Sequence, residues 1–138
     1  MKKILVLCTG NSCRSQIAEA YLRKFADGKF EVYSAGVEKH GLNPRAVATM
    51  AEDGIDISSH TSNNVDEYSD IVFDHVLTVC DHAQEVCPVL PGKHQKHHYS
   101  FTDPAKAQGD EESIMKVFSE VREQIKQYSQ EFIRKLEA

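Results

Sequence analysis

The feature that most constrains the fold is the short apolar run KKILVLC at residues 2–8, which leads into the small, polar stretch TGNSCRS. An uninterrupted apolar run of this length is typical of a parallel strand buried on both faces of a sheet. Parallel strands need a crossover between them, usually a helix. Helical spacing of apolar residues follows over Ser15–Phe25, and Asp27-Gly28 closes that segment. The start of the chain therefore predicts a strand, a tight loop and a helix.

The same alternation continues along the chain. We expect further strands at residues 29–36 and 74–80, and a more weakly patterned one at 97–101. A helix is expected at 43–54, with Asn43 as N-cap, Pro44 in the first turn and Gly54 past its end. An amphipathic helix from Ile114 to Leu136 should pack its apolar stripe on the sheet. Together these elements predict one α/β domain, residues 1–138, with a small parallel sheet covered on both faces.

Composition and charge exclude several classes of protein. The net charge is −5, whereas a nucleic-acid-binding protein needs a basic face, so we expect no nucleic-acid partner. No apolar run approaches the ~18 residues of a membrane span. The run Ile4–Leu7 is also too short for the core of a signal peptide. We expect a cytoplasmic monomer with no membrane partner, whose cysteines are free, catalytic or metal-binding rather than structural disulfides.

The loop after the first strand has the composition of an oxyanion site. A loop that runs from a strand end into a helix N-terminus can turn several backbone N–H groups inward, and such a nest binds tetrahedral oxyanions. We expect Gly10 and Asn11 to supply positive φ angles. Arg14 is placed to grip two oxyanion oxygens at once. The expected oxyanion-binding residues are Thr9, Gly10, Asn11, Ser12, Cys13 and Arg14.

Cys8, at the base of this loop, is the predicted nucleophile. There it would feel several N–H dipoles and the Arg14 guanidinium, which would favour its thiolate at neutral pH. Cys13 is expected to point elsewhere and to keep its proton. Ser15 is expected to donate its hydroxyl to the Cys8 sulfur or to cap the helix. The alternative is a cysteine-containing turn that only joins strand to helix.

The stretch CTGNSCRSQIAEA resembles the phosphate-binding loop of low-molecular-weight protein tyrosine phosphatases, and still more that of the thioredoxin-coupled arsenate reductases with the same fold. The similarity covers nearly the whole chain, through VYSAGVEKHGLNPRAV, GIDISSHTS, VLTVCDHAQEVCPVLPG, SFTDPA and VREQIK. The resemblance implies a four-stranded parallel sheet flanked by helices. It also implies the reaction, which is the reduction of arsenate to arsenite.

Two further cysteines, Cys80 and Cys87, flank the polar segment DHAQEV after the third expected strand. Taken alone, they could be small buried apolar residues. They could also be zinc ligands with His82 or the histidines of KHQKHH, although the spacing fits no common zinc pattern. Together with Cys8 they match the redox triad of the arsenate reductases. The resemblance therefore implies a relay from Cys8 to Cys80 to Cys87, whose final disulfide thioredoxin reduces.

The segment FTDPAKA places Asp103 before Pro104, which restricts the aspartate backbone to extended conformations. On turn chemistry alone this is an Asp-Pro turn. The resemblance makes Asp103 the general acid that protonates the leaving oxygen. Related phosphatases often carry an aromatic residue after the proline, but this chain has Ala105, which favours the reductase and would widen the pocket mouth.

Some relatives bind a potassium ion beside the loop. The matching positions in this chain are Asn11, Glu19, Ser34 and Thr61. The chain continues with Ser62-Asn63 where ion-binding relatives carry an aspartate, so a potassium site stays an open alternative. Without an ion, Glu19 would be a solvated helix residue and Thr61 part of a turn. The segment KHQKHH at 93–98 is expected to be a solvated loop, or otherwise part of a docking surface.

We therefore predict an arsenate reductase that binds arsenate or another tetrahedral oxyanion, holds no bound cofactor apart from this candidate ion, and takes electrons from reduced thioredoxin. The expected catalytic residues are Cys8, Cys80, Cys87, Arg14, Ser15 and Asp103. One alternative is a tyrosine phosphatase that uses Cys8, Arg14 and Asp103. Weak phosphatase activity is expected in either case, because phosphate and arsenate are both tetrahedral. A second alternative is a phosphate-binding or redox-sensing module without enzymatic activity.

Overall fold

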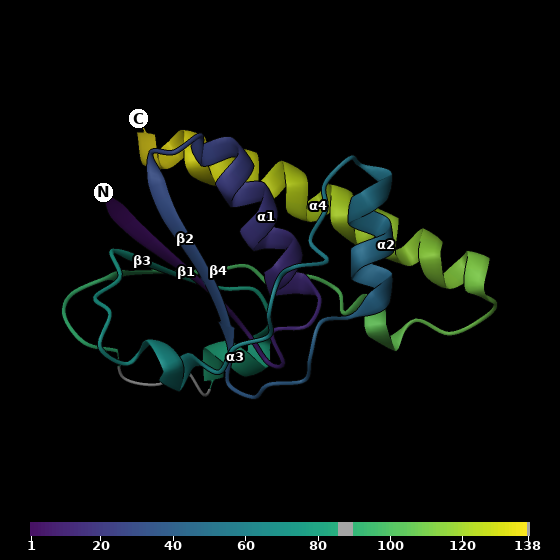
Figure 1. The fold of residues 1–138 in the computed structure, drawn as a ribbon, viewed down its shortest axis with the longest axis horizontal. Helices are drawn as coiled ribbons and strands as arrows, with labels where there is room; N and C mark the ends of the chain where they lie inside the picture. Colours follow the sequence, from purple (N-terminus) through teal and green to yellow (C-terminus); the bar gives the residue numbers. More distant parts are fainter. Residues whose placement is uncertain (86–89, 138) are drawn as a thin grey trace.

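A sheet of four parallel strands, in the order β2-β1-β3-β4, forms the centre of the molecule (Figure 1). The structure is a computed structural model that describes residues 1–85 and 90–137. The strands are β1 (Lys2–Cys8), β2 (Phe30–Gly36), β3 (His75–Thr78) and β4 (Gln95–His98). Residues 4–8 of β1 are buried, as a strand with neighbours on both sides and helices above it requires. The predicted fold class is confirmed.

The helices pack against one another and against the sheet. α1 (Arg14–Ala26) and α2 (Pro44–Glu52) both pack against the long α4 (Glu111–Glu137), and α1 also lies against β1 and β2. The short α3 (Asp81–Glu85) follows β3 and contacts β1 and β3 (Figure 1). Two 3₁₀ turns, η1 (Val65–Tyr68) and η2 (Pro104–Lys106), complete the described elements.

Most expected elements lie where the sequence placed them, and the differences have local causes. α2 begins after Asn43, whose side chain accepts hydrogen bonds from the backbone N–H groups of Arg45 and Ala46, as expected of an N-cap. α4 starts a turn earlier than its apolar stripe, because Asp110 accepts a hydrogen bond from the Ser113 N–H. α3 was not expected, since five residues carry too little periodicity to be recognised.

The assignment of KHQKHH to a solvated loop is wrong. Residues 95–98 form β4, which pairs with β3 from His75↔Gln95 to Thr78↔His98. Backbone hydrogen bonds extend the pairing to Phe101, whose N–H donates to the Val79 carbonyl at 3.1 Å. The fourth strand was therefore placed two residues too late. As an edge strand it exposes Gln95 and Lys96, and these polar residues hid it in the sequence.

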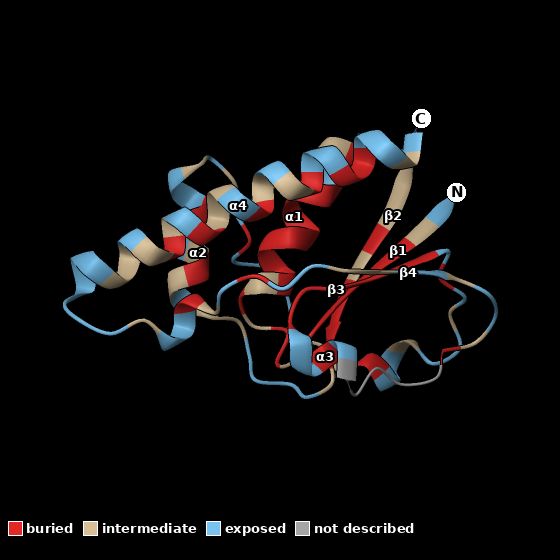
Figure 2. Ribbon diagram, turned by 180° about the vertical axis from the view of Figure 1, so that it is seen from behind, coloured by how far each residue is buried: buried red, intermediate tan, exposed pale blue. Residues whose placement is uncertain are grey.

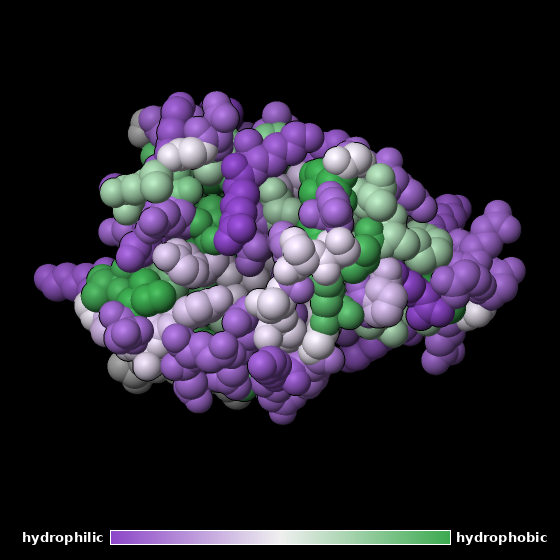
Figure 3. Space-filling view, in the orientation of Figure 1, coloured by the Kyte–Doolittle hydropathy of each residue, from purple (hydrophilic) through white to green (hydrophobic). Residues whose placement is uncertain are grey.

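The inner faces of α1 and α4 and the strands of the sheet form the buried core (Figure 2). The α4 stripe is core packing, as expected, with Phe118, Val121 and Ile125 buried. The face shown in Figure 3 is largely hydrophilic, and polar side chains separate its apolar groups. None of the helices in the described part of the chain is both long and apolar enough to cross a bilayer.

A partly buried pair of histidines links β3 to β4 and predicts a pH-dependent stability. Nδ1 of His75 lies 3.1 Å from Nε2 of His97, and burial lowers the pKa of both imidazoles. The unfolded chain then binds more protons than the folded one just below the ordinary histidine pKa of about 6.5. The free energy of unfolding should fall as the pH drops through that value, and His75→Asn should weaken this dependence. Urea unfolding at about pH 7.5 and about pH 5.5 measures it; an unchanged difference in the variant would contradict the assignment.

Candidate active site

A pocket of about 930 Å³ lies at the carboxyl ends of β1 and β3, where open α/β sheets bind ligands. The loop after β1, the start of α3 and the segment around Asp103 line it. The structure thus brings together most of the expected site residues: Cys8, Thr9, Gly10, Ser12, Cys13, Arg14, Cys80 and Asp103. Cys87 lies outside the described residues.

Direct pairing of β1 with β3 places two cysteines side by side. The parallel register runs from Ile4↔His75 to Leu7↔Thr78. Cys8 and Cys80 therefore both lie at the carboxyl end of the sheet. The two thiols interact closely enough that each shifts the pKa of the other. The hydroxyl oxygen of Thr9 lies 3.3 Å from the Cys80 sulfur. All three described cysteines, Cys8, Cys13 and Cys80, are buried and free.

The interaction of the two thiols moves their pKa values in opposite directions. The neighbouring Cys8 thiol, helped by the Thr9 hydroxyl and the Ala83 N–H, lowers the pKa of Cys80 to about 5. The neighbouring Cys80, together with burial, raises the pKa of Cys8 well above its usual range, although Arg14 acts in the opposite direction. A hydrogen bond between two acids favours loss of the first proton and opposes loss of the second.

These pKa directions oppose Cys8 as the thiolate in the protein without a bound oxyanion, while Arg14 favours it, so the thiolate on Cys8 stays a prediction. Sequence reasoning counted Arg14 and the backbone dipoles but could not see a second thiol against the first. Burial and the nearby Asp103 raise the pKa of Cys13 to about 12, so this thiol keeps its proton as expected. Cys13 nevertheless lines the same pocket as Cys8.

The segment 37–43 braces the oxyanion loop from behind. Backbone N–H groups of Val37, Glu38 and His40 donate to the carbonyls of residues 8, 9 and 10 at 2.8–3.1 Å, and Asn43 donates to that of residue 12. In a trans peptide, the carbonyl and the following N–H point in opposite directions. The N–H groups of residues 9, 10, 11 and 13 therefore point away from the brace, as a nest for an oxyanion requires.

Gly10 and Asn11 serve this loop in different ways. Asn11 has the expected positive φ of 50°, but Gly10 is not among the described positive-φ residues, so that expectation is wrong. Gly10 instead leaves room for the His40 side chain to lie against the loop. A Cβ at this position would lie 2.2 Å from Nδ1 of His40, whose imidazole covers the loop. His40 in turn bonds Glu38 at 2.7 Å, and both side chains line the pocket.

Arg14 and Asp103 face each other across the pocket. Nη1 of Arg14 donates to the Phe101 carbonyl at 3.0 Å, and Nη2 lies 3.6 Å from Oδ2 of Asp103. The other carboxylate oxygen of Asp103 accepts a hydrogen bond from the Ala105 N–H. Asp103 is thus both a turn-forming residue and a pocket residue, so the two interpretations of the Asp-Pro segment are compatible. Because the Ala105 N–H engages only Oδ1 of Asp103, Oδ2 faces the Arg14 guanidinium and is placed to contact a bound oxyanion.

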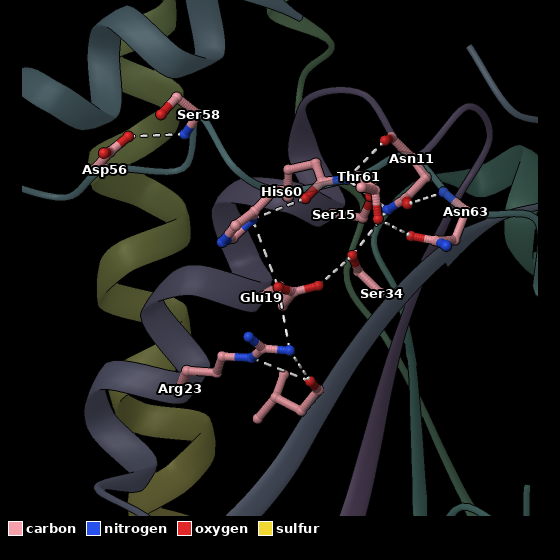
Figure 4. A network of polar contacts seen from close by, with 12 residues as sticks. Asn11, Ser15, Glu19, Arg23, Ser34, Asp56, Ser58, His60, Thr61 and Asn63 are labelled. Atoms are coloured by element: carbon pink, nitrogen blue, oxygen red, sulfur yellow. Dashed lines mark hydrogen bonds and ion pairs between the residues drawn. The ribbon is translucent and has the colours of Figure 1, made fainter. Parts of the chain in front are cut away.

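Ser15 belongs to a buried polar network behind the loop (Figure 4). Its hydroxyl accepts a hydrogen bond from Nδ2 of Asn11 at 2.8 Å, and Asn11 donates a second one to Ser34 at 3.0 Å. The N-cap position of α1 is Cys13, which makes no side-chain cap, so Ser15 does not cap the helix. A hydrogen bond from Ser15 to Cys8 is not among the contacts of the described residues. The network instead fixes Asn11 and its strained backbone.

This network also tests the candidate potassium site. Ser34 donates to Oε1 of Glu19 at 2.6 Å, and the other oxygen of Glu19 faces Arg23 and His60. Oδ1 of Asn11 accepts the Asn63 N–H, so Asn11 presents its NH₂ group to the cluster. A potassium ion needs oxygen ligands, but the oxygens here already meet protein donors or the Arg23 charge. As arranged, the cluster does not fit the ion, and no chemical step below uses it.

Two site features were beyond the reach of the sequence. The Thr9 hydroxyl contacts a sulfur 71 residues away, and the His40 ring contacts a glycine backbone; neither leaves a local pattern. The zinc alternative gains no support from the described residues, in which no group of three or more His, Cys, Asp or Glu side chains could hold a metal ion.

Comparisons with known proteins agree with this geometry. An arsenate reductase of Halalkalibacterium halodurans is 49% identical over 124 residues, which cover 90% of this chain and 89% of that protein. An arsenate reductase of Bacillus subtilis is 48% identical over 133 residues, which cover 95% of this chain and 94% of that protein. A solved structure of an arsenate reductase in the oxidized state superposes with a TM-score of 0.84 at 31% identity, covering 98% of each chain.

Another solved arsenate reductase, in a phosphate binding state, has a TM-score of 0.79 at 32% identity and also covers 98% of each chain. Residues 3–138 match the family described as low molecular weight phosphotyrosine protein phosphatase. The resemblance noted in the sequence is thereby confirmed: this chain belongs to the low molecular weight phosphotyrosine protein phosphatase family.

Proposed function

We propose that this protein reduces arsenate to arsenite by a cysteine relay. The observation that carries the proposal is that Cys8 and Cys80 follow paired strands into one pocket, where their interaction lowers the pKa of Cys80 to about 5. Hydrolysis of a phosphate ester needs one nucleophilic thiol, whereas reduction of arsenate needs two electrons, which a second thiol can begin to supply. The arsenate reductases among the relatives support the same substrate.

In the first step, arsenate occupies the nest and Cys8 attacks arsenic. The proton of the Cys8 thiol moves to the Cys80 thiolate as Cys8 attacks, so both sulfurs end this step uncharged. A sulfur–arsenic bond forms and an arsenic–oxygen bond breaks. The leaving oxygen takes a proton from Asp103 and departs as water, while Arg14 balances the charge on the remaining oxygens.

In the second step, Cys80 passes the proton that it took from Cys8 to an arsenic-bound oxygen and attacks the sulfur of Cys8 as a thiolate. The Thr9 hydroxyl and the Ala83 N–H still favour the Cys80 thiolate after Cys8 is bonded to arsenic. A Cys8–Cys80 disulfide forms as the sulfur–arsenic bond breaks. The electron pair of that bond stays on arsenic, which is reduced from As(V) to As(III) and leaves as arsenite.

In the third step, Cys87 attacks Cys80 and frees Cys8 as a thiolate. A disulfide needs Cα atoms within about 7 Å, so the segment that joins the two cysteines has to bring them together before they can bridge. The resulting disulfide is reduced by the dithiol of thioredoxin, the partner that the family resemblance implies.

A weak phosphatase activity is proposed as a side reaction of the same pocket. Cys8, Arg14 and Asp103 line it together, and a phosphate monoester has the same tetrahedral head as arsenate. Such a reaction would end with hydrolysis of a phosphocysteine and would not involve Cys80.

The relay predicts different stalling points for two cysteine variants. Cys87→Ser should release a single arsenite per protein molecule and stop as a Cys8–Cys80 disulfide, because no internal thiolate remains to attack Cys80. Cys80→Ser should stop earlier, with arsenic on Cys8 and little arsenite released. Wild type without thioredoxin should accumulate the Cys80–Cys87 disulfide. Arsenite counting and disulfide mapping by peptide mass measure these outcomes.

Cys13→Ser is the matched control and should keep sustained turnover with thioredoxin and arsenate. Sustained thioredoxin-coupled turnover in both Cys80→Ser and Cys87→Ser would refute the relay. The protein would then be better described as a phosphatase-like enzyme.

Arg14→Lys should damage the reaction severely although the positive charge is kept. A lysine ammonium cannot hold two oxyanion oxygens in one plane, nor replace the donor fork fixed by the Phe101 carbonyl. Loss of one such donor typically lowers kcat by about 10²–10³-fold. Arg45→Lys, which changes an exposed arginine paired with Glu111, is the control. Near-normal arsenite release by Arg14→Lys would show that Arg14 does not bind the oxyanion as described.

A further inference from the structure

The side chain of His98 contacts the chain on both sides of Cys80. Its Nδ1 lies 2.6 Å from Oγ1 of Thr78, and its Nε2 lies 3.1 Å from Oδ1 of Asp81. Thr78 and His98 are partners in the parallel pairing of β3 with β4, so the strand register fixes the position of this imidazole. Its side chain is only 24% exposed. His98 thus bridges the end of β3 and the first residue of α3.

Both contacts survive a change in the protonation of the imidazole. In the neutral ring, the Thr78 hydroxyl donates to Nδ1 and the Nε2–H donates to the Asp81 carboxylate. In the protonated ring, the Nδ1–H donates to Oγ1 of Thr78, whose own proton can turn to the carbonyl of His97 at 3.4 Å. The bridge is therefore a mechanical link rather than a pH-sensitive switch.

This link matters because the backbone bonds of the sheet stop just before Cys80. The last bond from β3 toward β1 is donated by the Val79 N–H to the Leu7 carbonyl at 3.0 Å. Cys80 follows, and its carbonyl already accepts the Gln84 N–H of α3. Cys80 therefore sits at a junction between the sheet and a short helix, and the His98 imidazole ties the two sides of that junction together.

We infer that His98 is a positioning residue that holds the Cys80 sulfur in line for attack on Cys8, an inference that rests on the proposed relay. Displacement at sulfur needs the incoming thiolate opposite the bond that breaks. A misplacement of about 1 Å can cost about 10²-fold in rate. His98 touches neither sulfur, so it acts through the backbone on either side of Cys80.

The effective concentration of Cys80 at Cys8 tests the inference without arsenate. Cys87→Ser protein is equilibrated with mixtures of reduced and oxidised glutathione, and the Cys8–Cys80 disulfide is quantified by alkylation and peptide mass. Adding His98→Ala should lower the effective concentration about tenfold. His98→Asn should recover part of the loss, because its amide nitrogen can replace Nδ1 at Thr78. His97→Asn is the matched control, since its ring faces His75 and Phe132 instead, and it should leave the value unchanged.

Equal effective concentrations in His98→Ala and its parent would overturn the inference. An equal loss in His97→Asn would also overturn it, because the effect would then belong to the edge strand as a whole. Thr78→Val removes the hydroxyl at nearly constant volume and should lower the value in the same direction, which keeps the test open if His98→Ala folds poorly. Arsenite release by the wild type reports separately on the proposed function: its absence would refute the reductase, while the disulfide equilibrium would still judge His98.

Discussion

The direct parallel pairing of β1 with β3 is the constraint on which the site depends. Neighbouring parallel strands have their carboxyl ends on the same side of a sheet. The pairing of β1 with β3 therefore places Cys8 and Cys80 close together, although they are 72 residues apart in the sequence. The oxyanion loop leaves that edge after β1, and α3 leaves it after β3. Oxyanion binding and thiol chemistry can therefore share a single pocket without any movement of the sheet.

Behind the oxyanion loop lie the parts of the structure that hold it in place, and the short helix α3 follows β3 at the same end of the sheet. The segment 37–43 and the Asn11–Ser34–Glu19 network hold the loop in shape before any ligand arrives. Such preorganisation is what makes fixed N–H donors effective toward developing charge. α3, by contrast, has only five residues. The proposed relay uses the fixed loop to bind the oxyanion and places the exchange between Cys80 and Cys87 on the segment that begins with this short helix.

The sequence was most informative where chemistry and periodicity coincide. The run KKILVLC, the capped helix after Asn43 and the α4 stripe each carry a local pattern, and the structure contains all three elements. The edge strand β4 was misplaced because its exposed polar residues give no alternation. The charge on the thiols could not be predicted, since the pKa of Cys8 is set by a sulfur from another strand. The contact of His40 with Gly10 was missed for the same reason.

The proximity of Cys8 and Cys80 at the carboxyl ends of paired strands predicts that the two thiols titrate together and that Cys80 loses its proton first. Carbon-13 NMR of reduced protein labelled at the cysteine Cβ atoms reports the protonation of each thiol without requiring access to a reagent. The Cys80 signal should move with an apparent pKa of about 5, while the Cys8 and Cys13 signals should not move through neutral pH. A Cys8 signal that moves first, with Cys80 still protonated, would contradict the account.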